Sequence, residues 1–134
     1  MARVERSVSL NVSADEVWNL IGNFADLGWF PGNRGTETMT VDGKLQRVVP
    51  LPGGAELREQ QEEDAGPHSY TYSIASGPMP VSNYTATLAV APEGGGCRVI
   101  WTAEFEPAGV PAEKAEAIVG GVFETGLKGI QEKF

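Results

Sequence analysis

Arg47 and Glu59 are two charged residues that the sequence could place on an otherwise apolar face. Arg47 alternates with Leu45 and Val49 along one predicted strand. Glu59 follows Leu57 at the same two-residue spacing, so the two charges share a face if both strands turn their aliphatic side chains inward. A carboxylate beside an arginine in an apolar cavity could orient a polar substituent, or polarise a carbonyl before enolisation. A register shift of one residue exchanges the faces, and the acidic stretch that begins at Glu59 would then be a solvated edge.

Aromatic residues form a second group of candidates, since most of them fall on predicted apolar faces. A buried phenol needs a hydrogen-bond partner, and tyrosines around an apolar space supply the few oriented polar groups that ligand pockets use. The alternative interpretation is that the same side chains are ordinary core. Gly126, on the apolar stripe of the last predicted helix, could widen a pocket or allow close contact between helix and sheet. The candidate ligand-binding positions are Trp29, Phe30, Tyr70, Tyr72, Tyr84, Trp101, Phe105, Val119, Phe123 and Gly126.

His68 and Cys97 are the single histidine and the single cysteine of the chain. His68 follows a Gly-Pro turn with no nucleophile spaced to use it, which favours a solvated turn residue over an acid or base. Cys97 begins a predicted strand with no histidine beside it that would activate the thiol. One histidine and one cysteine are too few for a structural zinc site, so no metal and no cofactor are expected. The sequence also lacks hydrolase, zinc-protease, phosphate-loop and dinucleotide-binding motifs.

Length and composition limit the classes of protein that this chain can be. Its 134 residues, 41% of them hydrophobic, suit a single domain over 1–134 with one sizeable core. The net charge of -8 disfavours nucleic acid and anionic membrane surfaces as partners. With one cysteine, no signal-peptide pattern and no apolar run of about 18 residues, we expect a cytoplasmic protein without membrane insertion. A monomer and a homodimer are both compatible with the sequence.

A strand, a capped helix and a bend are predicted at the start of the chain. The stretch Val4–Val12 alternates apolar and polar residues, as a half-buried strand does. Ser13 and Glu16 have the spacing of a capping box, and Val17 follows at the position of a hydrophobic staple. Apolar residues continue at helical spacing, but a glycine and an asparagine interrupt them, so two short helices that form a bend are predicted.

The middle of the chain is predicted to be a meander of antiparallel strands. Between Gly35 and Pro107 no stretch keeps helical periodicity, and turns rich in glycine and proline recur at short intervals. The last two strands alternate cleanly between apolar and polar residues, so each has one buried and one solvated face. The six predicted strands are Thr36–Val41, Lys44–Leu51, Ala55–Asp64, Ser69–Ser76, Ser82–Ala91 and Cys97–Glu106.

A long amphipathic helix is predicted at the end of the sequence. Pro111 suits its first turn, and apolar residues then recur every three or four positions to Phe134. Gly120, Gly121 and two further glycines in this stretch each cost about 1 kcal/mol relative to alanine, which packing must offset. The predicted fold class is therefore α+β, with one strand, two short helices, six antiparallel strands and a long helix inside a curved sheet.

Four groups of short strings carry a family resemblance over nearly the whole chain. They are Ser13-Ala-Asp-Glu-Val-Trp18, Phe24-Ala-Asp-Leu-Gly-Trp-Phe-Pro31, Gly77-Pro-Met-Pro-Val81 with Tyr84, and Val99-Ile-Trp101 through Phe105-Glu-Pro107. In this order they resemble the START/Bet v 1-like (SRPBCC) superfamily, and within it the bacterial polyketide cyclase/dehydrase and lipid-transport group. The resemblance implies a helix-grip fold, in which a seven-stranded sheet grips the C-terminal helix. It also implies a cavity between them that binds apolar or aromatic small molecules.

Three functions are compatible with these observations. The one we favour is binding of an apolar or aromatic small molecule, lipid-like or polyketide-like, in that cavity. The second is a polyketide cyclase or aromatase, with Tyr84, Glu59 or Arg47 assisting proton transfer, although the sequence contains no strong acid/base pair. The third is a protein-interaction module similar to the chaperone co-activators or antitoxin-like members of the superfamily, which a filled interior would favour.

Overall fold

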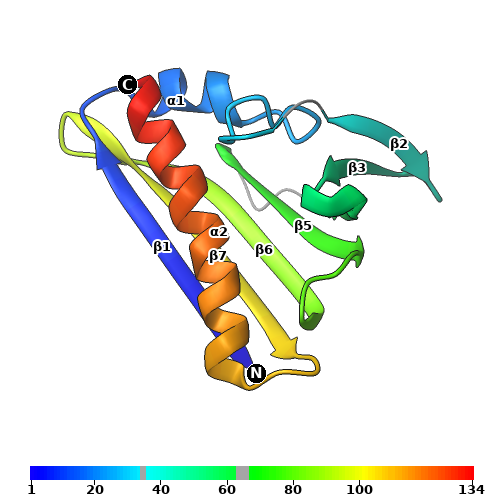
Figure 1. Ribbon diagram of the computed structural model, residues 1–134. Helices are drawn as coiled ribbons and strands as arrows, with labels where there is room; N and C mark the ends of the chain where they lie inside the picture. Colours follow the sequence, from blue (N-terminus) through cyan, green and yellow to red (C-terminus); the bar gives the residue numbers. More distant parts are fainter. Residues whose placement is uncertain (34–35, 63–66) are drawn as a thin grey trace.

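One antiparallel sheet curves around one long helix (Figure 1). The computed structural model describes residues 1–33, 36–62 and 67–134. The predicted α+β class, with seven strands and a long final helix, is confirmed. In chain order the elements are β1 (Ala2–Leu10), α1 (Ala14–Ile21), β2 (Glu37–Val41), β3 (Lys44–Pro50), the 3-10 turn η1 (Pro52–Gly54), β4 (Glu56–Gln61), β5 (Ser69–Ser76), β6 (Val81–Glu93), β7 (Gly96–Pro107) and α2 (Ala112–Lys133).

The sheet has the strand order β1-β7-β6-β5-β4-β3-β2, and every neighbouring pair is antiparallel. From β2 to β7 each strand pairs with the next along the chain, as a meander requires, and β1 adds to the free edge of β7. The six strands predicted in this region are present, with described ends shifted by no more than two residues. β4 ends at Gln61, whereas its predicted end, Asp64, lies outside the described residues.

β1 begins and ends two residues earlier than predicted, at Leu10 instead of Val12. The chain leaves the sheet after Leu10, and α1 begins only four residues later, at Ala14. Gly96 of β7 lies so close to the Leu10 carbonyl that a side chain at position 96 would collide with it. The last register pair of β1 and β7 is Leu10 with Cys97, directly beside this contact.

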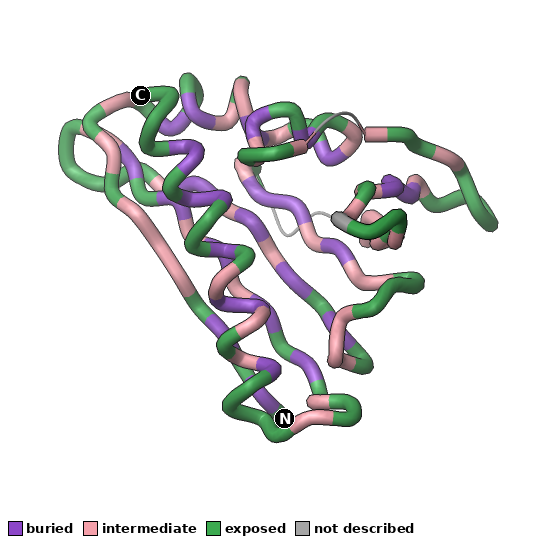
Figure 2. Tube along the Cα trace, viewed as in Figure 1, coloured by how far each residue is buried: buried purple, intermediate pink, exposed green. Residues whose placement is uncertain are grey.

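The inner faces of β6 and β7 form the centre of the core. Leu88 lies opposite Trp101 in the register of the two strands, and both side chains are buried. The outer face is polar, as in the hydrogen bond of 3.0 Å between the hydroxyls of Thr71 and Thr87. Figure 2 shows the resulting alternation of buried and exposed positions along the strands. The buried inward residues of these two strands are Tyr84, Ala86, Leu88, Val90, Cys97, Val99, Trp101, Ala103 and Phe105.

A bulge interrupts β6 beside Tyr84. Asn83 and Tyr84 lie opposite the single residue Phe105 of β7, because the register shifts at this point. Asn83 has a φ of 51°, in the left-handed region that asparagine tolerates better than most residues. The extra residue turns Val81 back toward the core, against which it packs. Tyr84 thus keeps its inward direction at the end of the sheet where the strand is locally bent.

α1 begins at the predicted capping box. The Ser13 hydroxyl accepts a hydrogen bond of 3.2 Å from the backbone N–H of Glu16, and Val17 is fully buried below it. The helix ends at Ile21, and the N–H of the C-cap residue Gly22 donates to the carbonyl of Trp18 at 2.8 Å. The sequence therefore predicted the start of this helix correctly.

The prediction of a second short helix after α1 is wrong, since the chain continues in turns. The Asn23 side chain accepts a hydrogen bond of 3.0 Å from the N–H of Ala25, and Asp26 accepts one of 2.8 Å from Gly28. These local bonds satisfy backbone donors that a helix would otherwise use, so they compete with helix formation. Apolar spacing alone did not reveal this competition.

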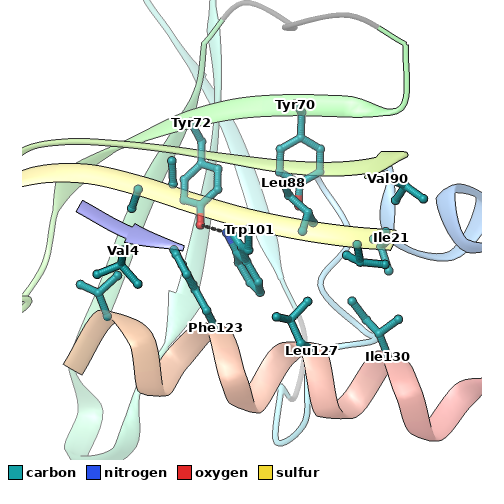
Figure 3. Packing of buried hydrophobic residues seen from close by; sticks show 14 of the residues in the cluster. Val4, Ile21, Tyr70, Tyr72, Leu88, Val90, Trp101, Phe123, Leu127 and Ile130 are labelled. Atoms are coloured by element: carbon teal, nitrogen blue, oxygen red, sulfur yellow. Dashed lines mark hydrogen bonds between the residues drawn. The ribbon is translucent and has the colours of Figure 1, made fainter. Parts of the chain in front are cut away.

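α2 lies across β1 and β7, and its apolar stripe faces the inside of the sheet (Figures 1 and 3). Three of its glycines lie where other side chains come close: Gly120 contacts Arg6, Gly126 contacts Trp101 and Phe30, and Gly129 contacts Pro31. These contacts supply the packing that offsets the low helix propensity of glycine. Within the described part of the chain, no helix is long and apolar enough to span a membrane.

Candidate functional site

A cavity of about 310 Å³ lies between the inner face of the sheet and the middle of α2. Small-molecule sites typically measure roughly 300–1,000 Å³, so the volume suits a small ligand. Most of its wall is apolar, with side chains from β3 to β7, from α2 and from the turn segment after α1. Gly32, Pro50 and Val122 line the cavity and are exposed, so the cavity opens to solvent beside the middle of α2.

Arg47 and Glu59 form an ion pair in the wall of this cavity. They lie directly opposite each other in the register of β3 and β4, and Arg47 Nε donates to Glu59 Oε1 at 2.8 Å. The side chain of Arg47 is 1% exposed and that of Glu59 is 9% exposed. The structure thus places both charges on the inner face, and Glu59 does not lie on a solvated edge.

Aromatic rings and a backbone carbonyl enclose the Arg47 guanidinium. Nη1 donates to the carbonyl of Phe24 at 2.9 Å and to the Tyr70 hydroxyl at 3.4 Å. The guanidinium carbon lies 4.1 Å from the ring centre of Phe24 and 4.9 Å from that of Tyr72, which is cation–π geometry. Burial alone would lower the pKa of Arg47, but the Glu59 carboxylate and the tyrosines more than offset this and raise it. Arg47 is therefore a permanent cation in the wall.

All three tyrosines of the chain are buried around this pair. Burial raises the pKa values of Tyr70, Tyr72 and Tyr84, so each remains a neutral phenol. Tyr72 accepts a hydrogen bond of 3.0 Å from Trp101 Nε1, as Figure 3 shows. This bond uses an oxygen lone pair, so Tyr72 keeps its own hydroxyl proton to donate.

Trp101 joins the sheet side of the cavity to the helix side. Its ring stacks on Phe123 of α2, with ring centres 4.5 Å apart and an interplanar angle of 11°. Figure 3 shows this pair between β7 and α2, with Tyr72 reaching down to the indole nitrogen. The stack and the hydrogen bond together hold Trp101 in one orientation at the cavity wall.

The structure brings six of the ten predicted ligand-binding residues to the cavity. Phe105 is instead fully buried and stacks on Tyr84, with ring centres 5.9 Å apart. Tyr70 touches Arg47 behind the wall. Gly126 does not widen the cavity, because the rings of Trp101 and Phe30 occupy the space beside it. A Cβ at this position would lie 2.6 Å from Trp101 Cζ3. The six that line the cavity are Phe30, Tyr72, Tyr84, Trp101, Val119 and Phe123.

Trp29, the remaining candidate, is 4% exposed and also lies outside the cavity wall. Its ring centre is 5.9 Å from those of Phe30 and Trp101, so it packs behind two residues that do line the cavity. Its indole nitrogen has no hydrogen-bond partner among the described residues. Trp29 therefore supports the wall from behind.

Several cavity residues were absent from the predicted set. Val49 and Leu57 share the face of Arg47 and Glu59 by alternation, so the same pattern could have identified them. Ile74 continues the alternation of Tyr70 and Tyr72 along β5, and Val122 lies in the apolar repeat of α2, so these two could also have been identified. The rest lie in turns, in loops or at a strand end, where no periodicity points inward. The wall residues outside the predicted set are Leu27, Pro31, Gly32, Asn33, Val49, Pro50, Leu51, Leu57, Ile74, Met79 and Val122.

His68 and Cys97 lie away from the cavity. His68 Nε2 is 3.0 Å from a carboxylate oxygen of Asp15 at the start of α1, so it links a turn to this helix. Cys97 is buried, and burial together with Glu93 raises the pKa of its thiol. Neither residue contributes to the site described above.

The curved sheet that grips one long helix defines a class, the helix-grip domains of START/Bet v 1-like type. The START superfamily protein from Mycobacterium smegmatis has this fold, with a TM-score of 0.79 at 15% identity, over 99% of this chain and 97% of that one. This chain belongs to the family described as polyketide cyclase / dehydrase and lipid transport, which matches residues 1–134. There is no significant match among curated proteins.

Two further solved structures are similar to this chain. The protein XoxI from Bacillus cereus is 33% identical, with a TM-score of 0.90 over 100% of this chain and 96% of that one. Norcoclaurine synthase from Thalictrum flavum, solved with dopamine and hydroxybenzaldehyde, is 18% identical, with a TM-score of 0.69 over 97% of this chain and 84% of that one. At that identity the second likeness concerns the fold alone.

Proposed function

We propose that the protein binds an apolar or aromatic small molecule in the cavity between the sheet and α2. The observation that carries this proposal is an open cavity of about 310 Å³ whose wall is mainly apolar and contains one charge-balanced polar pair. Burial of apolar ligand surface is favourable by about 25 cal/mol per Å². A wall held by stacked rings and hydrogen bonds needs little reordering, so more of that free energy is available for binding.

The family description supports the proposal, because it includes lipid transport beside cyclase and dehydrase activity. The synthase from Thalictrum flavum was solved with two small aromatic compounds, and this chain shares its fold.

Isothermal titration against polycyclic phenols and fatty acids tests this proposal. Val49 lines the cavity, so Val49→Phe should fill part of it and weaken binding at least about tenfold. Val41 lies outside the cavity and is 37% exposed, so Val41→Phe is the matched control and should bind as the wild type does. No saturable binding of any compound, or equal binding by the Val49→Phe variant, contradicts the proposal.

A second candidate is a cyclase that acts in the same cavity. The observation that favours it is the presence of Arg47, Glu59 and the neutral phenol of Tyr84 on one wall, where they could assist proton transfer to and from a polyketone. Analysis of the products formed from a poly-β-ketone by the wild type and by Glu59→Gln and Arg47→Ala tests it. Product ratios that do not differ from those without protein contradict this activity.

The third function, a protein-interaction module, was expected to have a filled interior. An open cavity gives it no support, so we do not propose it.

A further inference from the structure

We infer that the cavity selects neutral ligands that carry a hydroxyl group, and that Glu59 and Arg47 together bind this hydroxyl. The inference rests on the proposed function and deepens it, because it specifies the polar group of the ligand. It follows from three properties of the ion pair: the hydrogen-bonding atoms that remain unused, the positions of these atoms and the net charge.

The ion pair uses only part of its hydrogen-bonding capacity within the protein. A guanidinium has five N–H donors, and the bonds of Arg47 engage Nε and Nη1. Glu59 accepts through Oε1. Among the described residues, Nη2 of Arg47 has no acceptor and Oε2 of Glu59 has no donor. The ion pair thus leaves one donor group and one acceptor atom without a partner among the described residues.

Both unused atoms reach the cavity. Arg47 and Glu59 line it, although both side chains are more than nine-tenths buried. Among the described residues, the side-chain nitrogen or oxygen that is both fully enclosed by protein and without a hydrogen-bond partner is Nε1 of Trp29. Neither Nη2 of Arg47 nor Oε2 of Glu59 is enclosed in this way. Nη2 and Oε2 are therefore not sealed inside protein, and their accessible surface faces the cavity that their residues line.

A hydroxyl group matches this arrangement because it can accept one hydrogen bond and donate another. Its oxygen can accept from Nη2 of Arg47 while its proton goes to Oε2 of Glu59. A carboxylate or an ether oxygen has no proton to donate, so either would cover Oε2 of Glu59 and leave it without a hydrogen bond once the ligand has displaced water. An unpaired buried carboxylate oxygen is costly, which makes the preference for a hydroxyl strong.

The charge of the wall also disfavours an anionic ligand. Arg47 is already neutralised by Glu59 at 2.8 Å, and no other described residue of the cavity wall is charged. A bound carboxylate would add an uncompensated negative charge to this interior, which is unfavourable without a further cation. Fatty acids should therefore bind more weakly than alcohols or phenols of the same size.

Three probes with the same ring system test the inference: 2-naphthol, 2-methoxynaphthalene and 2-naphthoate. We expect the wild type at pH 7 to bind 2-naphthol about ten- to a hundredfold more tightly than either of the others. Glu59→Gln replaces the acceptor Oε2 with an amide donor and leaves Arg47 without its counter-charge, so this variant should prefer 2-naphthoate. Glu62→Gln removes a carboxylate that pairs with Lys44 outside the cavity and should keep the wild-type preference.

Two results would overturn the inference while the proposed function stands. They are equal binding of the three probes by the wild type, and an unchanged preference for 2-naphthol in a folded Glu59→Gln variant. No saturable binding of any probe would overturn the proposed function, and the inference with it. Circular dichroism checks that each variant is folded. If Glu59→Gln does not fold, the wild-type order of affinities decides alone.

Discussion

Gly126 of α2 is in direct contact with Trp101 of β7, and a Cβ at position 126 would lie 2.6 Å from Cζ3 of the indole ring. The same Cβ would lie 2.9 Å from Cε2 of Phe30. The absence of a side chain here lets two aromatic residues of the cavity wall pack against the helix. Alanine at this position would push the rings toward the cavity or the helix away from the sheet.

Gly126→Ala is therefore expected to destabilise the protein relative to Gly121→Ala. Overpacking against Trp101 costs about 1–3 kcal/mol, whereas alanine gains about 1 kcal/mol of helix propensity at either position. A Cβ at Gly121 would meet no atom within 4 Å, so that substitution should be neutral or stabilising. Urea denaturation of both variants measures the difference. Equal stabilities would show that the rings can move without cost.

Arg47→Met should lower the free energy of unfolding by about 3–5 kcal/mol, because it leaves the Glu59 carboxylate buried without its partner. The double substitution Arg47→Met with Glu59→Leu removes both charges, so it should cost less than the sum of the two single substitutions. Chemical denaturation of the four proteins in a double-mutant cycle measures this coupling. Additive effects would mean that the coupling free energy between Arg47 and Glu59 is zero.

The tyrosines are expected to titrate only when the protein unfolds. Phenols of the unfolded chain lose their protons at about pH 10, whereas burial raises the pKa values of Tyr70, Tyr72 and Tyr84 in the folded protein. Their contribution to stability is therefore complete below about pH 10 and is lost as the pH rises through the folded values. Tyrosinate absorbance should thus appear together with the loss of far-ultraviolet circular dichroism. Tyrosinate formation in the folded state would contradict this.

Glu62 should contribute to stability in acid. Hydrogen bonds from Lys44, Ser73 and Gln60 lower the pKa of Glu62 to about 2. Because the folded pKa is lowered, the contribution is complete above about pH 4.5 and is lost as the pH falls toward 2. The side chain is 27% exposed, so we expect less than about 1 kcal/mol. Urea denaturation of wild type and Glu62→Gln over this range should show the two stabilities converging in acid.

The parts of the fold that depend on neighbours in sequence could be predicted. The capping box at Ser13 set the start of α1, and apolar alternation identified the inner faces of β6 and β7. The turns after α1 were missed because side chains of Asn23 and Asp26 bond to nearby backbone N–H groups. Such bonds leave no trace in the spacing of apolar residues.

Alternation along a strand and spacing along a helix are local properties, so the sequence alone predicted the inward faces of β6, β7 and α2 but left the faces of β3 and β4 open. Which of the inward residues line the cavity depends on the packing of the whole sheet against α2. Tyr72 and Tyr84 line the cavity, whereas Phe105 is buried against Tyr84 and the ring of Trp101 occupies the space beside Gly126. That difference depends on how far the curved sheet stands from α2 at each position, which is the combined result of every strand pairing.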